Sequence, residues 1–151
     1  MAENPDAVVE RLKELVGELP TEWTRPLPNR LYVRVEKGNV RELCRIVFED
    51  LGARFATATG SDVGKELEVV YHFAYDAAGL VVNVRVRTPK GDPVLPSIVP
   101  AVPAAEWIER EMNDLLGLVF EEHPDPRRLI LADDWPEGVH PLRKEEREDE
   151  S

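Results

Sequence analysis

Two stretches of regularly alternating residues constrain this chain of 151 residues more than any other feature. In residues 67–75 and again in residues 80–86, every second side chain is apolar. The alternating positions are Leu67, Val69, Tyr71, Phe73 and Tyr75, followed by Leu80, Val82, Val84 and Val86. A period of two is typical of strands that bury one face. The short interruption at 76–79, which ends in Gly79, predicts that the two strands form an antiparallel hairpin.

Helical and strand patterns flank this hairpin on both sides. Apolar residues at spacings of three and four predict helices over 5–19, 39–51 and 104–116. Shorter strand patterns occupy 31–35 and 54–59. The resulting order α-β-α-β-β-β-α predicts a single α+β domain, in which a mostly antiparallel sheet carries helices packed on one face.

Local signals mark the helix ends and the buried faces. Asn4 is placed to cap the first helix, and Pro20 to stop it. Asn39 followed by Glu42 resembles a capping box for the second helix. The first helix is expected to bury Val8, Leu12, Leu15 and Leu19, and the last to bury Ala104, Trp107, Ile108, Met112, Leu115 and Leu116.

Composition excludes several classes of function. There are 19 Lys and Arg against 30 Asp and Glu, so the net charge is −11, which argues against binding to nucleic acid or to an anionic membrane surface. No apolar run approaches the ~20 residues of a membrane span. The single cysteine, Cys44, excludes an internal disulfide framework and an iron–sulfur cluster or structural zinc held by this chain's own thiolates. We interpret Cys44 as a small buried side chain of the second helix.

The carboxyl-terminal third has a different character. We divide the chain into a domain at 1–117, an extended arm at 118–144 and a charged, disordered tail at 145–151. The arm lacks helical periodicity but carries apolar residues, among them Phe120, Trp135 and Leu142. From the residues alone, two readings stay open: the arm folds back on its own sheet, or it lies on a second protein with arginines and aromatic residues as anchors.

Two arrangements of polar residues suggest chemistry. Glu111, Asp114 and His123 have donor atoms that suit zinc or iron, although Gly117 separates the first two from the third. Asp133 and Asp134, with His140, would be the acid–base residues of a stand-alone enzyme acting on a small substrate near Trp135. Neighbours along an extended chain point in opposite directions, so a turn at 133–136 is the simpler interpretation of the two aspartates.

The last helix and the arm also contain a recognisable series of motifs. In order, they are Glu109-Arg110-Glu111, Asp114-Leu115-Leu116-Gly117, Phe120, His123-Pro124-Asp125, Arg127-Arg128-Leu129, Asp134-Trp135 and His140-Pro141-Leu142-Arg143-Lys144. This series resembles the signature of a respiratory complex I family, that of the thirty-kilodalton subunit of NADH:quinone oxidoreductase. The same module occurs in energy-converting nickel–iron hydrogenases and formate hydrogenlyases, and Leu131 to Pro136 looks more like that branch.

The resemblance implies a non-catalytic structural subunit in the hydrophilic arm of a complex-I-like membrane redox enzyme. It implies no cofactor in this chain, no membrane span, a peripheral location on the cytoplasmic side, and docking onto a hydrogenase-like large subunit beside an iron–sulfur small subunit. The equivalent hydrogenase subunit is the alternative, and it is close to an even choice at this point. The partner-binding residues implied are Glu109, Arg110, Glu111, Asp114, His123, Arg127, Arg128, Trp135, Arg143 and Lys144. Of these, we expect the four on the last helix to form a charged network that fixes the helix against the arm.

Overall fold

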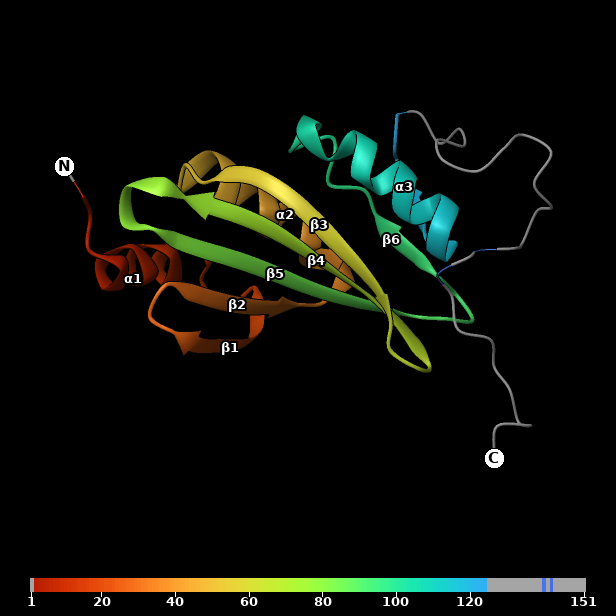
Figure 1. Cartoon of the computed structure of the whole chain (residues 1–151), viewed down its shortest axis with the longest axis horizontal. Helices are drawn as coiled ribbons and strands as arrows, with labels where there is room; N and C mark the ends of the chain where they lie inside the picture. Colours follow the sequence, from red (N-terminus) through yellow and green to blue (C-terminus); the bar gives the residue numbers. More distant parts are fainter. Residues whose placement is uncertain (1, 125–139, 141, 143–151) are drawn as a thin grey trace.

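A mixed sheet of five strands forms the centre of the molecule (Figure 1). The computed structural model describes residues 2–124, 140 and 142. The strands are β1 (Pro20–Leu27), β2 (Arg30–Val35), β3 (Arg54–Asp62), β4 (Glu66–Tyr75) and β5 (Leu80–Pro89), arranged in the order β1-β2-β5-β4-β3. Neighbouring strands are antiparallel except β2 and β5, which are parallel. The predicted hairpin is β4–β5, and the α+β class is confirmed.

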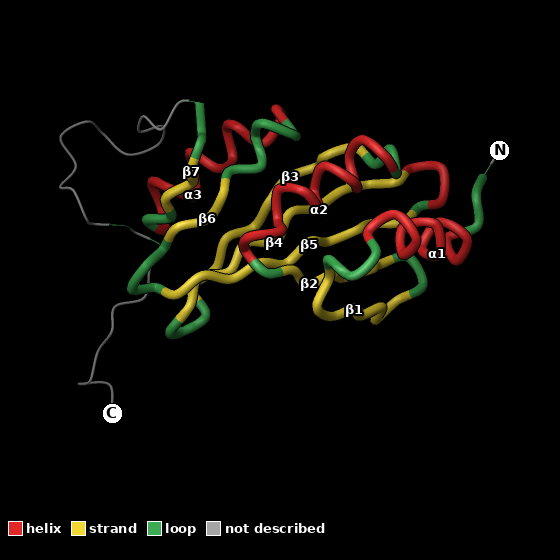
Figure 2. The backbone as a smooth tube through the Cα atoms, turned by 180° about the vertical axis from the view of Figure 1, so that it is seen from behind, coloured by secondary structure: helices red, strands yellow, loops and turns green. Residues whose placement is uncertain are grey.

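Helices α1 (Pro5–Val16) and α2 (Val40–Arg45) cover one face of this sheet, as Figure 2 shows from behind. A π-helical turn, Ile46–Asp50, continues α2, and three short 3-10 turns lie at Lys37–Asn39, Asp76–Ala78 and Pro103–Ala105. The core between the layers contains the alternating residues of the hairpin, such as Tyr71 and Val84, together with Leu12 of α1 and Leu43 of α2. The placement of helices on one face agrees with the prediction.

A smaller group of elements packs against the second half of β3, near Gly60. It consists of α3 (Glu106–Leu116) and a two-stranded parallel sheet, β6 (Val94–Pro96) with β7 (Val119–Glu121). Gly60 of β3 allows α3 to approach closely, because a Cβ at that position would lie 2.6 Å from a methyl carbon of Leu116. Leu118 and Phe120 are buried in the same core. The folded body therefore continues past 117, the end of the domain expected from the sequence.

The structure adds three strands to the predicted order: β1, β6 and β7. The first helix ends at Val16 rather than at Pro20, because Gly17 adopts a positive φ of 57° and closes the helix. Pro20 instead opens β1 at the edge of the sheet, where a residue without an N–H is tolerated. Leu15, expected in the buried stripe, is 38% exposed. Asn4 does cap α1, with its side chain accepting from the Asp6 N–H at 2.7 Å.

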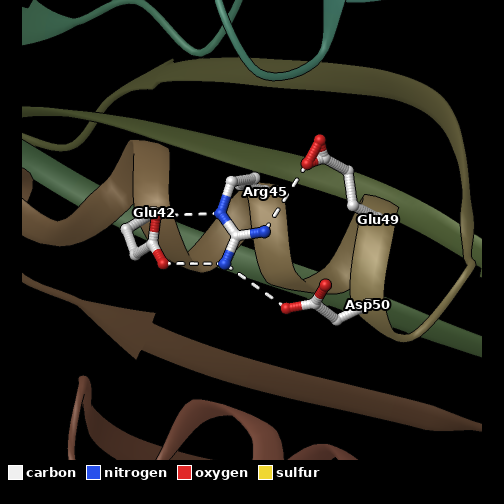
Figure 3. Close-up of polar contacts among 4 residues, drawn as sticks. All are labelled: Glu42, Arg45, Glu49 and Asp50. Atoms are coloured by element: carbon white, nitrogen blue, oxygen red, sulfur yellow. Dashed lines mark hydrogen bonds and ion pairs between the residues drawn. The ribbon is translucent and has the colours of Figure 1, made fainter.

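The capping box expected at the start of the second helix is wrong. Asn39 makes no side-chain cap hydrogen bond. Glu42 instead accepts two hydrogen bonds from Arg45, at 3.0 and 2.9 Å, and Arg45 also pairs with Glu49 and Asp50 (Figure 3). The guanidinium holds the pKa of Glu42 below its ordinary value. This network is largely exposed, so its effect on stability is small.

Candidate functional site

Glu109 of α3 is the most unusual side chain in the molecule, because it is a carboxylate with 0% exposure. Three donors surround it. The Tyr71 hydroxyl donates to Oε2 at 2.8 Å, the Ser97 hydroxyl to Oε1 at 2.6 Å, and the Ile98 backbone N–H to Oε2 at 3.0 Å. One side chain therefore ties α3 to the central sheet and to the segment that follows β6.

Burial raises the pKa of Glu109, although its three hydrogen bonds and the nearby charge of His123 act in the opposite direction. The Tyr71 hydroxyl and the Cys44 thiol are buried in the same part of the core as Glu109. Burial raises the pKa of each well above its ordinary value, and the charge of Glu109 adds to the effect. Cys44 is a buried free thiol, as expected from its position in the second helix.

The raised pKa of Glu109 predicts a specific pH dependence. Below the ordinary value of 4.5, Glu109 is protonated in both the folded and the unfolded chain. As pH rises from there to the folded pKa, the unfolded chain ionises first, and the contribution of this residue to stability falls. We therefore expect native protein to lose stability relative to the Glu109→Gln variant across this window. Urea unfolding of both at a series of pH values measures the difference, and a pH-independent difference would contradict the assignment.

His123, one of the implied partner-binding residues, lies beside the first turn of α3. Its Nε2 donates to the backbone oxygen of Glu106 at 3.0 Å. Arg41 of α2 pairs with Glu122 of the same stretch at 2.6 Å, and it also donates to the backbone oxygen of Ser97, after β6, at 2.6 Å. Glu122 itself has a positive φ of 68°. Residues 119–123 are thus fixed on the body by α2 and α3 together.

The carboxyl end of α3 receives residues from the end of the arm. Gly117 has a φ of 78°, and its N–H bonds the Asn113 carbonyl. His140 Nδ1 donates to the Asp114 carbonyl at 3.1 Å, and the Leu142 N–H donates to the Leu115 carbonyl at 2.8 Å. The last carbonyls of a helix have no partner within the helix. Two of them are satisfied here by residues that lie far along the chain from the helix.

Glu109, one member of the charged network expected on the last helix, turns into the core and bonds neutral donors. Arg110 stacks over the Trp107 ring, with 5.8 Å from its guanidinium carbon to the ring centroid. Glu111 lines a hollow of about 210 Å³ between α3 and β3, together with Met112 and Leu142. Asp114 is buried. Glu109 and Glu111 therefore lie in different surroundings, although they are only two positions apart.

The buried stripe of α3 is also rotated from the expected one. Ala104 and Trp107 are exposed, the latter by 62%, whereas Ala105 and Glu109 are buried with Met112 and Leu116. The spacing of these four residues is four, three and four, which is helical. This spacing was the available signal for burial of Glu109. Nothing in the local sequence pointed to its partners Tyr71 and Ser97, which come from distant segments.

Several candidate residues lie outside the described part of the chain: Arg127, Arg128, Asp133, Asp134, Trp135, Arg143 and Lys144. Among residues 2–124, 140 and 142, no group of three or more His, Cys, Asp or Glu side chains could hold a metal ion. His123 of the suggested metal triad bonds a backbone carbonyl. No helix in the same residues is long and apolar enough to cross a membrane.

The chain is thus an α+β module in which the last helix, α3, is hydrogen-bonded to segments that lie far from it in the sequence. Its sequence matches, over residues 33–150, the family described as the 30 kDa subunit of respiratory-chain NADH dehydrogenase. The chain belongs to this family, and the resemblance drawn from its motifs is confirmed.

Relatives come from more than one kind of complex. The chain is 36% identical over 129 residues to the beta subunit of the membrane-bound hydrogenase of Pyrococcus furiosus, covering 83% of this chain and 73% of that protein. It is 34% identical over 112 residues to the C subunit of the NADH-quinone oxidoreductase of Streptomyces coelicolor, covering 70% of this chain and 45% of that protein. It thus spans less than half of the latter protein.

A solved structure supports the same relationship. A chain of the membrane-bound sulfane sulfur reductase, an archaeal respiratory membrane complex, superimposes with a TM-score of 0.79 at 27% sequence identity. The match covers 91% of the present chain and 82% of that chain. The fold is therefore shared across respiratory complexes with different names.

Proposed function

We propose that this chain is a non-catalytic structural subunit in the hydrophilic arm of a complex-I-like membrane redox enzyme, equivalent to the thirty-kilodalton subunit of NADH-quinone oxidoreductase. The observation that carries the proposal is the family match over 33–150, which includes every motif of the last helix and arm. The geometry agrees with a structural role. Glu109, with 0% exposure, uses its carboxylate oxygens on three donors of its own chain.

The partners proposed are a hydrogenase-like large subunit and an iron–sulfur small subunit of the same complex, on the cytoplasmic side of the membrane. Relatives are named as subunits of NADH-quinone oxidoreductase and of membrane-bound hydrogenase, which supports an assembly with other chains. We further propose that this chain holds no cofactor. Relatives of both types match, but the family's own description is NADH dehydrogenase, and no feature of the described residues favours the hydrogenase type.

The decisive experiment is to purify the tagged full chain from its native membranes and to identify the proteins that accompany it. A large subunit homologous to those of nickel–iron hydrogenases is the expected companion. If that subunit lacks nickel-binding CxxC pairs, the quinone-reducing type is supported. A chain that purifies alone, with a bound prosthetic group or turnover of its own, would overturn the proposal.

Changing Arg127 and Arg128 together to alanine is expected to reduce recovery of the large subunit. Loss of two interfacial arginines corresponds to a decrease of about tenfold or more in affinity. The matched control is Arg11→Ala, because Arg11 is an exposed arginine of α1 that bonds Tyr75 and Glu3 of its own chain. Equal recovery with both variants would show that Arg127 and Arg128 do not contact the large subunit.

A further inference from the structure

The face of the central sheet opposite α1 and α2 carries an unusual set of side chains. Five cross-strand rows of the register make up this open face: Arg54-Ala74-Val81-Arg30-Leu27, Thr57-His72-Asn83-Tyr32-Thr24, Thr59-Val70-Arg85-Arg34-Glu22, Ser61-Glu68-Arg87 and Glu66-Pro89. The rows contain five arginines, three glutamates and no lysine. The open face is therefore positive, although the net charge of the whole chain is −11.

Arg54 pairs closely with Asp76, at 3.0 and 3.2 Å, but the arginines at the centre of the face pair less fully with acids. Glu68, whose side chain is 9% exposed, accepts a hydrogen bond from Arg87 at 2.9 Å and is 3.7 Å from Arg85. Arg85 also lies over the Tyr32 ring at 5.1 Å, and its Nε has no hydrogen-bond partner in the described part of the chain. Arg34 reaches Glu22 only at 3.9 Å. The Nε of Arg85 is buried, but the side chains of Arg34 and Arg85 are 41% and 40% exposed, so both present guanidinium nitrogens to an outside acceptor.

The polar side chains at the centre of the open face are held in a fixed arrangement. His72 bridges Thr59 and Asn83 through its two ring nitrogens, at 2.8 and 2.6 Å, and Asn83 donates to the Leu31 carbonyl at 3.1 Å. These bonds cross four neighbouring strands, so Tyr32 and the arginines around it stand on a rigid support. Preorganised side chains lose little conformational entropy when a partner binds.

Arginine and tyrosine are enriched in protein–protein interfaces, whereas lysine is depleted. Guanidinium groups pair with carboxylates in a two-pronged geometry. We propose that the open face docks an acidic segment of a partner polypeptide in the same complex, with Tyr32, Arg34 and Arg85 at the centre of the contact. The inference rests on the proposed function, since it requires a partner subunit.

Charge disfavours two other occupants. A second copy of the chain, related by a two-fold axis through this face, would bring arginines against arginines. Nucleic acid would be repelled by the large negative charge on the rest of the chain. The charge of the open face therefore favours an acidic protein surface as its partner.

A photo-crosslinking residue tests the proposal in the purified complex. We expect Tyr32→p-benzoylphenylalanine in the full chain to crosslink to a peptide of another subunit that contains Asp or Glu residues beside the attachment point. In the variant that also carries Arg34→Glu and Arg85→Glu, the yield should fall at least about tenfold, because like charges then face each other. Arg34→Lys with Arg85→Lys should retain most of the yield. Leu15→p-benzoylphenylalanine, at an exposed position of α1, is the matched control.

The outcomes separate this inference from the proposed function. If the complex assembles but Tyr32 crosslinks to nothing, to a second copy or to nucleic acid, the inference is overturned and the proposed function stands. An unchanged yield after charge reversal also overturns it. If no complex can be purified with the tagged chain, both this inference and the proposed function are overturned. Circular dichroism of each variant reports folding, and should charge reversal prevent folding, the identity of the Tyr32 crosslink alone decides.

Discussion

Replacing Glu109 with alanine is expected to lower the free energy of unfolding by about 3–5 kcal/mol. The change removes the acceptor of three buried donors, so the O–H groups of Tyr71 and Ser97 and the N–H of Ile98 no longer have an acceptor. Each unsatisfied buried group costs about 1–3 kcal/mol. Urea unfolding of the full chain, followed by tryptophan fluorescence, measures the loss.

Two further variants control this experiment. Glu111→Ala removes an acid from the same helix at a half-buried position beside a hollow, and is expected to cost less than about 1 kcal/mol. Glu109→Gln keeps one acceptor oxygen, so its loss of stability should lie between the losses of Glu109→Ala and Glu111→Ala. If Glu109→Ala and Glu111→Ala lose the same stability, Glu109 does not have the anchoring role described here.

The second large effect is expected for Gly117→Ala, with a loss of about 2–4 kcal/mol. A Cβ at Gly117 would lie 2.6 Å from Cδ2 of the His140 ring, and a φ of 78° is unfavourable for alanine. The ring must therefore move, and its hydrogen bond to the Asp114 carbonyl is lost. Thermal unfolding measures the stability, and hydrogen exchange at Leu142 reports whether the end of the arm has left the helix.

A double variant separates the two causes. In His140→Ala the ring is already absent, so adding Gly117→Ala should then cost only the backbone strain, about 1 kcal/mol. If Gly117→Ala costs the same with and without the His140 ring, contact between these residues contributes nothing to stability.

The sequence predicted the parts of the fold that local patterns encode. The alternation in 67–75 and 80–86 has one physical interpretation, since only an extended chain places every second side chain on one face. The hairpin and the class of fold followed from it. Strand β1 was missed because its burial pattern is irregular and it contains Pro20 and Pro26, residues that usually argue against a strand. Strands β6 and β7 have three residues each, too few to show a period.

The candidate site was predicted only in part, for a related reason. The motif containing Glu109, Arg110 and Asp114 identified the important helix and the family. Charge alone suggested that these residues pair with one another. The structure shows that Glu109 instead finds neutral donors, and those donors come from β4 and from the segment after β6, far away in sequence. A pattern along one helix cannot contain that information.

The parallel pairing of β2 with β5 affects the order in which the molecule assembles. The β3–β4 and β4–β5 pairs are hairpins that close locally, and so is β1–β2. Only β5, whose residues lie about fifty positions after those of β2, joins the two groups. Isolated hairpins are marginally stable in water, so a nascent chain that has reached only residue 79 holds two fragments without a shared core. We therefore expect the sheet to be completed only after β5 has left the ribosome, and slow synthesis just before that point to leave the apolar faces of both fragments exposed.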